Sequence, residues 1–175
     1  MIIIPETIGN LLSGESSKWW QKCYYNTEME GILKKIDRFL NGPEITLFHH
    51  FHKPPYGGGN QFLLALEKEL KARGHVVGRN KVGSATKVML FNSFNFDFKK
   101  LLKLKKKFPN IRMIHRVDGP ISTYRGDERA DTDQKIWQMN RELADATIFQ
   151  SEYSRDKHLG MGFTFKDASV IHNAV

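Results

Sequence analysis

Short apolar runs alternate along this chain with stretches in which apolar residues recur every three or four positions. The apolar runs have the length and residue types of buried strands and occupy residues 45–51, 76–77, 87–91, 111–115, 146–149 and 168–171. Helical spacing is found at residues 62–70, 98–108, 136–143 and 152–159. This alternation predicts an α/β fold, in which residues 44–175 form a Rossmann-like, doubly wound parallel sheet of five or six strands.

Residues 1–43 stand outside this alternation and predict an N-terminal helical extension. Thr27 and Glu30 have the spacing of a capping box at the start of a helix. The apolar face that follows consists of Met29, Ile32, Leu33, Ile36 and Leu40. We expect this face to pack on the main domain. The alternative is that the adjacent tryptophans, Trp19 and Trp20, dock a partner protein.

The composition of the chain limits the class of protein to which it belongs. Of its 175 residues, 40% are hydrophobic and 26% are charged, and no apolar run is long enough to span a bilayer. Cys23 is the only cysteine, so no intrachain disulfide can form, and we expect a reducing, cytoplasmic location. The formal net charge of +8 favours an anionic partner.

Part of this positive charge is concentrated in six lysines between Lys99 and Lys107. A basic amphipathic helix can lie on an anionic membrane surface, which would make the protein peripheral to the membrane. We favour the more common interpretation, a solvated face over an ordinary core stripe. No nucleic-acid partner is expected, because the aromatic residues here lie on the apolar side and not among the lysines as stacking platforms.

A glycine turn links the first predicted strand to the first predicted helix. Gly57, Gly58 and Gly59 form the turn, and Asn60 follows them. This arrangement directs the free N–H groups and the positive dipole end of the helix toward the turn, and glycines allow an anion to approach the backbone. The sequence therefore suggests a phosphate site. An ordinary strand-to-helix turn is the alternative, and a glycine triplet by itself favours that alternative.

Polar side chains follow the fourth predicted strand. His115 ends this strand, Arg116 and Asp118 come next, and Tyr124 and Arg125 continue the loop. In open α/β sheets, ligands bind at the carboxyl ends of the strands, so these residues are candidates for a binding site. A histidine at a strand end can also simply bond to loop carbonyl groups.

Two other kinds of ligand are not expected. His50 and His52 can share one face of a strand, but no acidic or cysteine residue is spaced to complete a metal site with them. The loop GGGNQF lacks the G-x-G-x-x-G spacing of a nicotinamide-binding domain, and no acidic residue closes a plausible second strand.

Four segments of the chain resemble the retaining glycosyltransferases of family 4, which have the two-domain GT-B fold. PPYGGGNQFLLALEKELKARGH is similar to the first glycine loop and helix of that family, and IRMIHRVDGP to a central strand followed by a histidine. A later strand–helix segment of the family is similar to LADATIFQSEYSRDKHLGMGF. The segment that leads into the family's second domain is similar to ASVIHNAV. The resemblance covers residues 44–175 and implies the N-terminal half of a GT-B fold.

The resemblance implies transfer of a sugar, with retention, from a nucleotide-sugar donor to a glycan, lipid-linked or small-molecule acceptor. No cofactor and no bound metal is expected. The residues assigned to the donor diphosphate are Gly57, Gly58, Gly59 and Asn60. His115 is assigned to the transferred sugar or the reacting centre, as the catalytic residue. The residues assigned to the acceptor pocket are Arg116, Asp118, Tyr124 and Arg125.

In that family a C-terminal domain carries most of the nucleotide contacts, and its match would begin where these 175 residues end. We therefore expect a fragment, a truncated gene product or one subunit of a split enzyme, which folds alone but transfers sugar poorly or not at all. The alternative is a non-catalytic α/β binding module that docks on an anionic membrane or a partner protein. The sequence does not identify the sugar, the nucleotide or the acceptor.

Overall fold

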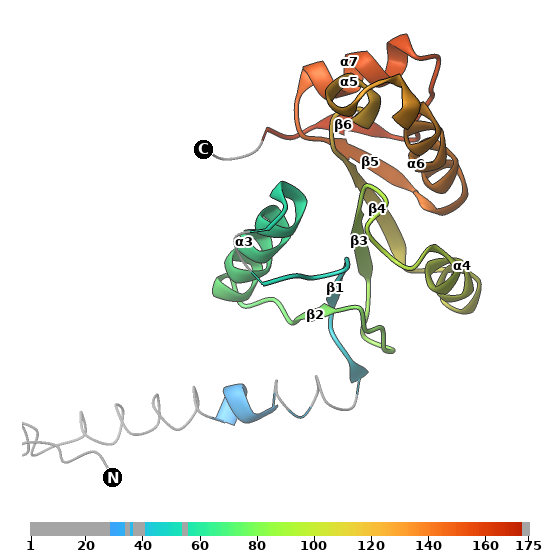
Figure 1. Cartoon of the computed structure of the whole chain (residues 1–175). Helices are drawn as coiled ribbons and strands as arrows, with labels where there is room; N and C mark the ends of the chain where they lie inside the picture. Colours follow the sequence, from blue (N-terminus) through green and yellow to red (C-terminus); the bar gives the residue numbers. More distant parts are fainter. Residues whose placement is uncertain (1–28, 34–35, 37–40, 54–55, 173–175) are drawn as a thin grey trace, which may run out of the picture. The chain divides into compact units, whose positions relative to one another are not determined.

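The computed structural model describes residues 29–33, 36, 41–53 and 56–172 (Figure 1). The chain divides into two units, residues 1–40 and 41–175, and the second contains the whole sheet. In the first unit, residues 29–33 and 36 are helical, and the large apolar side chains among them are exposed. Thr27, Leu40, Trp19, Trp20 and Cys23 lie outside the described residues. The capping box, the packing of the extension and the docking role therefore stay predictions.

Six parallel strands form one sheet in the second unit, in the order β2-β1-β3-β4-β5-β6. The strands are β1 (Ile45–Phe48), β2 (Val77–Arg79), β3 (Val88–Asn92), β4 (Arg112–Val117), β5 (Ala146–Phe149) and β6 (Ala168–Val170). The strand order reverses between β1 and β3. The predicted fold class, a Rossmann-like doubly wound parallel sheet, is confirmed. In such sheets, the point where the strand order reverses is the usual position of a ligand.

Helices cover both faces of this sheet. They are α3 (Gly58–Ala72), α4 (Phe98–Lys107), α5 (Ile121–Arg125), α6 (Ala130–Leu143) and α7 (Glu152–Gly160), with a short 3-10 helix η1 (Asp127–Arg129). Figure 1 shows α3 on one side of the sheet and α4 and α6 on the other. Within the described part of the chain, none of the helices is both long enough and apolar enough to cross a membrane.

The core explains why the central strands read as continuous apolar runs. Leu47 of β1 packs in one cluster with Leu63 of α3, whereas the next residue, Phe48, packs in another with Leu101 of α4. Successive side chains of a strand point to opposite faces, and here both faces are buried under helices. The apolar stripes of α3 and α4 are therefore used in the core of the domain.

The fourth strand is longer than the sequence predicts. β4 continues past His115 to Val117, because Arg116 and Val117 pair with Ile148 and Phe149 of β5. Both added side chains are buried. A charged residue after an apolar run predicts the end of a strand, and here a buried arginine breaks that rule.

The prediction of a loop around Tyr124 and Arg125 is wrong, because both residues belong to the short helix α5. Asp133 of α6 stabilises the start of α5 from a distance in sequence. Its carboxylate accepts hydrogen bonds from the backbone N–H groups of Ile121 (2.7 Å) and Ser122 (3.0 Å) and from the Ser122 hydroxyl (2.6 Å). Helix starts need such acceptors for their free N–H groups, but local patterns do not reveal one that comes from another element.

Candidate functional site

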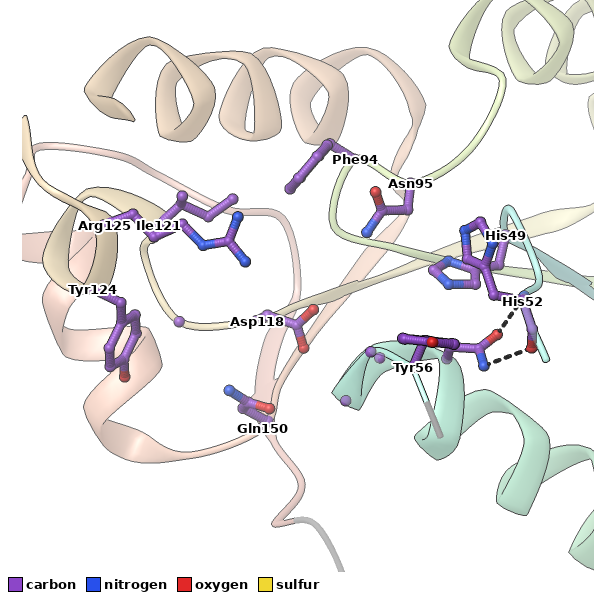
Figure 2. A pocket seen from close by; sticks show the side chains of 15 residues that line it. His49, His52, Tyr56, Phe94, Asn95, Asp118, Ile121, Tyr124, Arg125 and Gln150 are labelled. Atoms are coloured by element: carbon purple, nitrogen blue, oxygen red, sulfur yellow. Dashed lines mark hydrogen bonds between the residues drawn. The ribbon is translucent and has the colours of Figure 1, made fainter. Parts of the chain in front are cut away.

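A pocket of about 490 Å³ lies at the carboxyl ends of the strands, next to the reversal of strand order between β1 and β3. Residues that follow four different strands line it: His49, Phe94, Asn95, Asp118 and Gln150. Figure 2 shows Asp118 between His49 on one side and Tyr124 and Arg125 on the other. This is the position at which open α/β sheets bind ligands.

The structure brings most of the predicted site residues to this pocket. Those that line it are Gly57, Gly58, Gly59, Asn60, Asp118, Tyr124 and Arg125. His115 and Arg116 do not line it, and their side chains are 0% and 2% exposed. The glycine turn and the segment after β4 therefore converge as predicted, but two of the predicted contact residues lie in the interior.

The three glycines of the turn have different structural roles. Gly57, the N-cap of α3, has a φ of +73°, which L side chains rarely adopt. A Cβ at Gly59 would lie 2.5 Å from Nδ2 of Asn92, so packing requires a glycine there. A Cβ at Gly58 would meet no atom within 4 Å. The backbone conformation explains the glycine at position 57 and packing explains the one at position 59, whereas at Gly58 the space that a side chain would fill is open.

Asn60 holds the protein's own backbone. Its Oδ1 accepts a hydrogen bond from the N–H of His52 at 3.1 Å, and its Nδ2 donates to the carbonyl of His52 at 3.0 Å (Figure 2). One of the two side-chain N–H groups and the side-chain oxygen therefore serve the fold, and the expected contact of Asn60 with the donor phosphate stays a prediction. The start of α3 has no side-chain cap and no acidic residue in its first turn. Its N–H groups and positive dipole end are thus the part of the turn suited to an anion.

Asp118 is held by donors from three residues. Its Oδ2 accepts hydrogen bonds from Nδ2 of Asn92 and Oγ of Ser93, both at 2.8 Å, and its Oδ1 accepts one from Nη1 of Arg116. The Asp118 side chain is 32% exposed, so part of the carboxylate faces the pocket. Charge-assisted hydrogen bonds of this kind fix a carboxylate in one orientation. Asp118 is therefore a preorganised acceptor of hydrogen bonds.

Arg116 is the cation that supports Asp118. Its guanidinium also donates to Oδ1 of Asn92 at 2.6 Å and to Oε1 of Gln150 at 3.0 Å, and it lies 4.1 Å from the centre of the Phe62 ring. A buried charge requires such partners. The expected contact of Arg116 with the acceptor is not what the structure shows. Arg116 instead positions Asp118 and Gln150, and both of these line the pocket.

His115 is also a supporting residue. Its Nε2–H donates to the carbonyl of Ser93 at 2.8 Å, its Nδ1 accepts from Nδ2 of Asn140 at 3.1 Å, and its ring stacks on Phe91. Burial lowers the pKa of His115 to about 4, so the ring is neutral at neutral pH. Both ring nitrogens are used inside the domain. His115 therefore holds the turn at Ser93, which in turn bonds Asp118, and the expected direct contact with a sugar does not fit this placement.

Sequence reasoning missed several pocket residues. His49 falls inside the strand expected at 45–51, but β1 ends at Phe48 and leaves His49 at the pocket. Gln150 directly follows a correctly predicted strand, so its position at a carboxyl end was a usable signal. In the part of the chain that the structure describes, no three His, Cys, Asp or Glu side chains are grouped to hold a metal ion.

A comparison with family models, with curated proteins and with solved structures gives no match. The resemblance to family 4 glycosyltransferases therefore depends on the four segments of the sequence alone. What the structure adds is the fold and the convergence of the glycine turn with Asp118.

Proposed function

We propose that residues 44–175 are the acceptor-side, N-terminal domain of a family 4-like retaining glycosyltransferase, which transfers a sugar from a nucleotide-sugar donor to an acceptor of unknown identity. The observation that carries this proposal is that the glycine turn before α3 and Asp118 after β4 line one pocket. A helix start and a fixed carboxylate offer complementary groups to the two substrates. The first suits a diphosphate, and the second suits a hydroxyl.

The chemistry of sugar transfer supports this assignment. The leaving diphosphate gains negative charge as the glycosidic bond breaks, and N–H groups at a helix start stabilise that charge without reorganising. An acceptor hydroxyl can donate a hydrogen bond to Asp118 and be oriented by it. A Cβ at Gly59 would lie 3.4 Å from Oδ2 of Asp118, so the carboxylate is next to the turn and repels a phosphate that approaches Gly59. The diphosphate is therefore expected at Gly58, where a Cβ would meet no atom within 4 Å. Tyr124 and Arg125 complete the opposite side of the pocket.

Nucleotide sugars give the direct test. We expect UDP-glucose or GDP-mannose at millimolar concentrations to shift the backbone amide NMR signals of Gly58, Gly59 and Asp118. The affinity is expected to be weak, because in the family that this chain resembles most nucleotide contacts come from a second domain. Failure of every nucleotide sugar in a panel to shift these signals would contradict the proposal.

A matched pair of variants makes this test specific. Gly58→Val places a side chain in the open space of the pocket, and we expect it to remove the shifts. Gly160→Val makes the same change at the end of α7, where a Cβ also meets no atom within 4 Å but no pocket residue is nearby in sequence. This variant should bind as the unmodified chain does. Equal binding by all three proteins would place the ligand elsewhere.

A second candidate function is docking on an anionic membrane through α4. Its lysines Lys99, Lys103, Lys106 and Lys107 are exposed, which favours a partner of negative charge. The apolar residues of α4 are used in the core, where Leu101 is buried and Phe98, Leu102 and Leu104 pack around it. Any such docking is therefore electrostatic.

A further inference from the structure

His49 has hydrogen-bonding capacity that the protein does not use. It follows β1 directly, lines the pocket and is 3% exposed. Its Nδ1 is buried and has no hydrogen-bond partner among the residues that the structure describes. Buried polar atoms almost always have a partner in native proteins. Because Nδ1 is enclosed, a ligand in the pocket cannot reach it. The other ring nitrogen, Nε2, is neither enclosed nor hydrogen-bonded among the residues that the structure describes, and in a side chain that lines the pocket it is the nitrogen open to a ligand.

The backbone around His49 is fixed from both neighbouring strands. Asn80, which follows β2, accepts a hydrogen bond from the N–H of His49 at 3.0 Å and donates one to its carbonyl at 2.9 Å. The N–H of His50 donates to the carbonyl of Asn95, which follows β3, at 2.7 Å. The His49 ring also meets Phe51 edge-on, with 5.5 Å between ring centres. The imidazole is therefore preorganised, and a ligand does not need to order it.

The charges around His49 decide which ligand group it suits. Burial lowers its pKa, the neighbouring His50 and His52 lower it further, and Asp118 opposes this change. A neutral imidazole has one N–H donor and one lone-pair acceptor. Only one ring nitrogen is open to the pocket, so a hydroxyl can bond to it whether that nitrogen carries the proton or the lone pair, whereas a phosphate oxygen, which only accepts, can bond to it only when it carries the proton. The ring therefore suits a hydroxyl better than a phosphate.

We propose that His49 recognises a hydroxyl of the sugar part of a ligand bound in this pocket. This inference rests on the proposed function and adds a specificity residue to it. His49 and Asp118 line the same pocket, and Figure 2 shows Asp118 between His49 and Arg125, so a sugar bound there faces both kinds of side chain. His49 then distinguishes a nucleotide sugar from the nucleotide alone.

The test compares ligands with and without the sugar. We expect His49→Phe to weaken the binding of UDP-glucose and GDP-mannose about tenfold, the loss of roughly one hydrogen bond, with UDP and GDP changed less than about twofold. His49→Gln should recover part of the loss, because its amide both donates and accepts. His50→Phe is the matched control, since the His50 side chain is exposed and does not line the pocket. This control should bind all four ligands normally.

Three results would overturn the inference. Equal losses for nucleotide sugars and nucleotides would show a merely structural role for His49. If His49→Phe binds the nucleotide sugars as the unmodified chain does, and the Gly58 amide signal still shifts, then His49 does not recognise the sugar but the proposed function stands. If His49→Phe does not fold, the ring NMR signals of His49 in the unmodified chain give the test. The inference requires that they shift with UDP-glucose and not with UDP, and any other result contradicts it. If the NMR signal of the Gly58 amide does not shift with any of the ligands, the proposed function itself is contradicted.

Discussion

The side chain of Asn92 fills the space into which a Cβ at Gly59 would project, with Nδ2 only 2.5 Å from that position. Asn92 is fully buried, and it bonds both Asp118 and Arg116. The start of α3 and the segment after β4 therefore pack against one side chain. The glycine turn is thus part of the scaffold that fixes the pocket carboxylate, in addition to any contact it makes with a ligand.

This packing predicts different effects at two adjacent glycines. We expect Gly59→Ala to lower the free energy of unfolding by about 1–3 kcal/mol, because the new methyl group overpacks against Asn92. Gly58→Ala should leave it unchanged or raise it by up to about 1 kcal/mol, since alanine has the higher helix propensity and the site is open. Urea unfolding of both variants measures this difference. Equal effects would mean that the turn does not pack as described.

The ion pair between Arg116 and Asp118 predicts a large loss of stability when the cation is removed. Arg116→Met leaves Asp118 without its charged partner and removes the hydrogen bonds that Arg116 donates to Asn92 and Gln150, and such losses typically cost about 3–5 kcal/mol. We expect the low end of this range, because the Asp118 side chain is 32% exposed.

Denaturant unfolding tests this with two comparisons. Arg125→Met, at an exposed position, should change the free energy of unfolding by no more than about 0.5 kcal/mol. Adding Asp118→Asn to Arg116→Met should cost less than the sum of the single changes, because the two residues share one interaction. Additive losses would exclude the ion pair as the cause.

The sheet could be predicted from the sequence because its central strands are buried on both faces. Residues 87–91 and 146–149 are apolar runs between polar stretches, and β3 and β5 lie within one residue of them. The convergence of the glycine turn with the segment around His115 could also be predicted, since the carboxyl ends of parallel strands lie on the same edge of a sheet. It is Asp118 of that segment, and not His115, that lines the pocket.

The role of Arg116 could not be predicted in the same way, and for His115 the sequence offered the bond to a loop carbonyl group only as the alternative to a ligand contact. A charged residue and a histidine at a strand end are typical of a binding site, and nothing local shows that both are buried. Their partners come from other elements: Asn92 and Gln150 for Arg116, and Ser93 and Asn140 for His115. Such long-range pairs appear only when the strands are placed side by side.

The packing of α4 predicts how the domain behaves with membranes. The apolar residues that would insert into a bilayer, Leu101 and Leu102 among them, belong to the core. We therefore expect no co-sedimentation with phosphatidylcholine vesicles, and any binding to vesicles that also contain phosphatidylserine should disappear at high salt. Lys103→Glu with Lys106→Glu should remove that binding. Salt-resistant binding, or binding to neutral vesicles, would show that another apolar surface inserts.

The burial of His115 predicts a loss of stability in mild acid. The pKa of His115 is about 4 in the folded chain and about 6.5 in the unfolded chain, so the unfolded chain takes up a proton first as the pH falls. Stability is fully present above about pH 6.5 and falls by up to about 3 kcal/mol as the pH drops to 4.

The pKa values of His49 and His158 are also lowered by burial, so His115→Gln should reduce this pH dependence without abolishing it. His172→Gln, at an exposed position, should leave it unchanged. Urea unfolding at pH 7, 5.5 and 4 measures the slopes, and identical slopes for the unmodified chain and His115→Gln would show that His115 is not buried as a neutral ring.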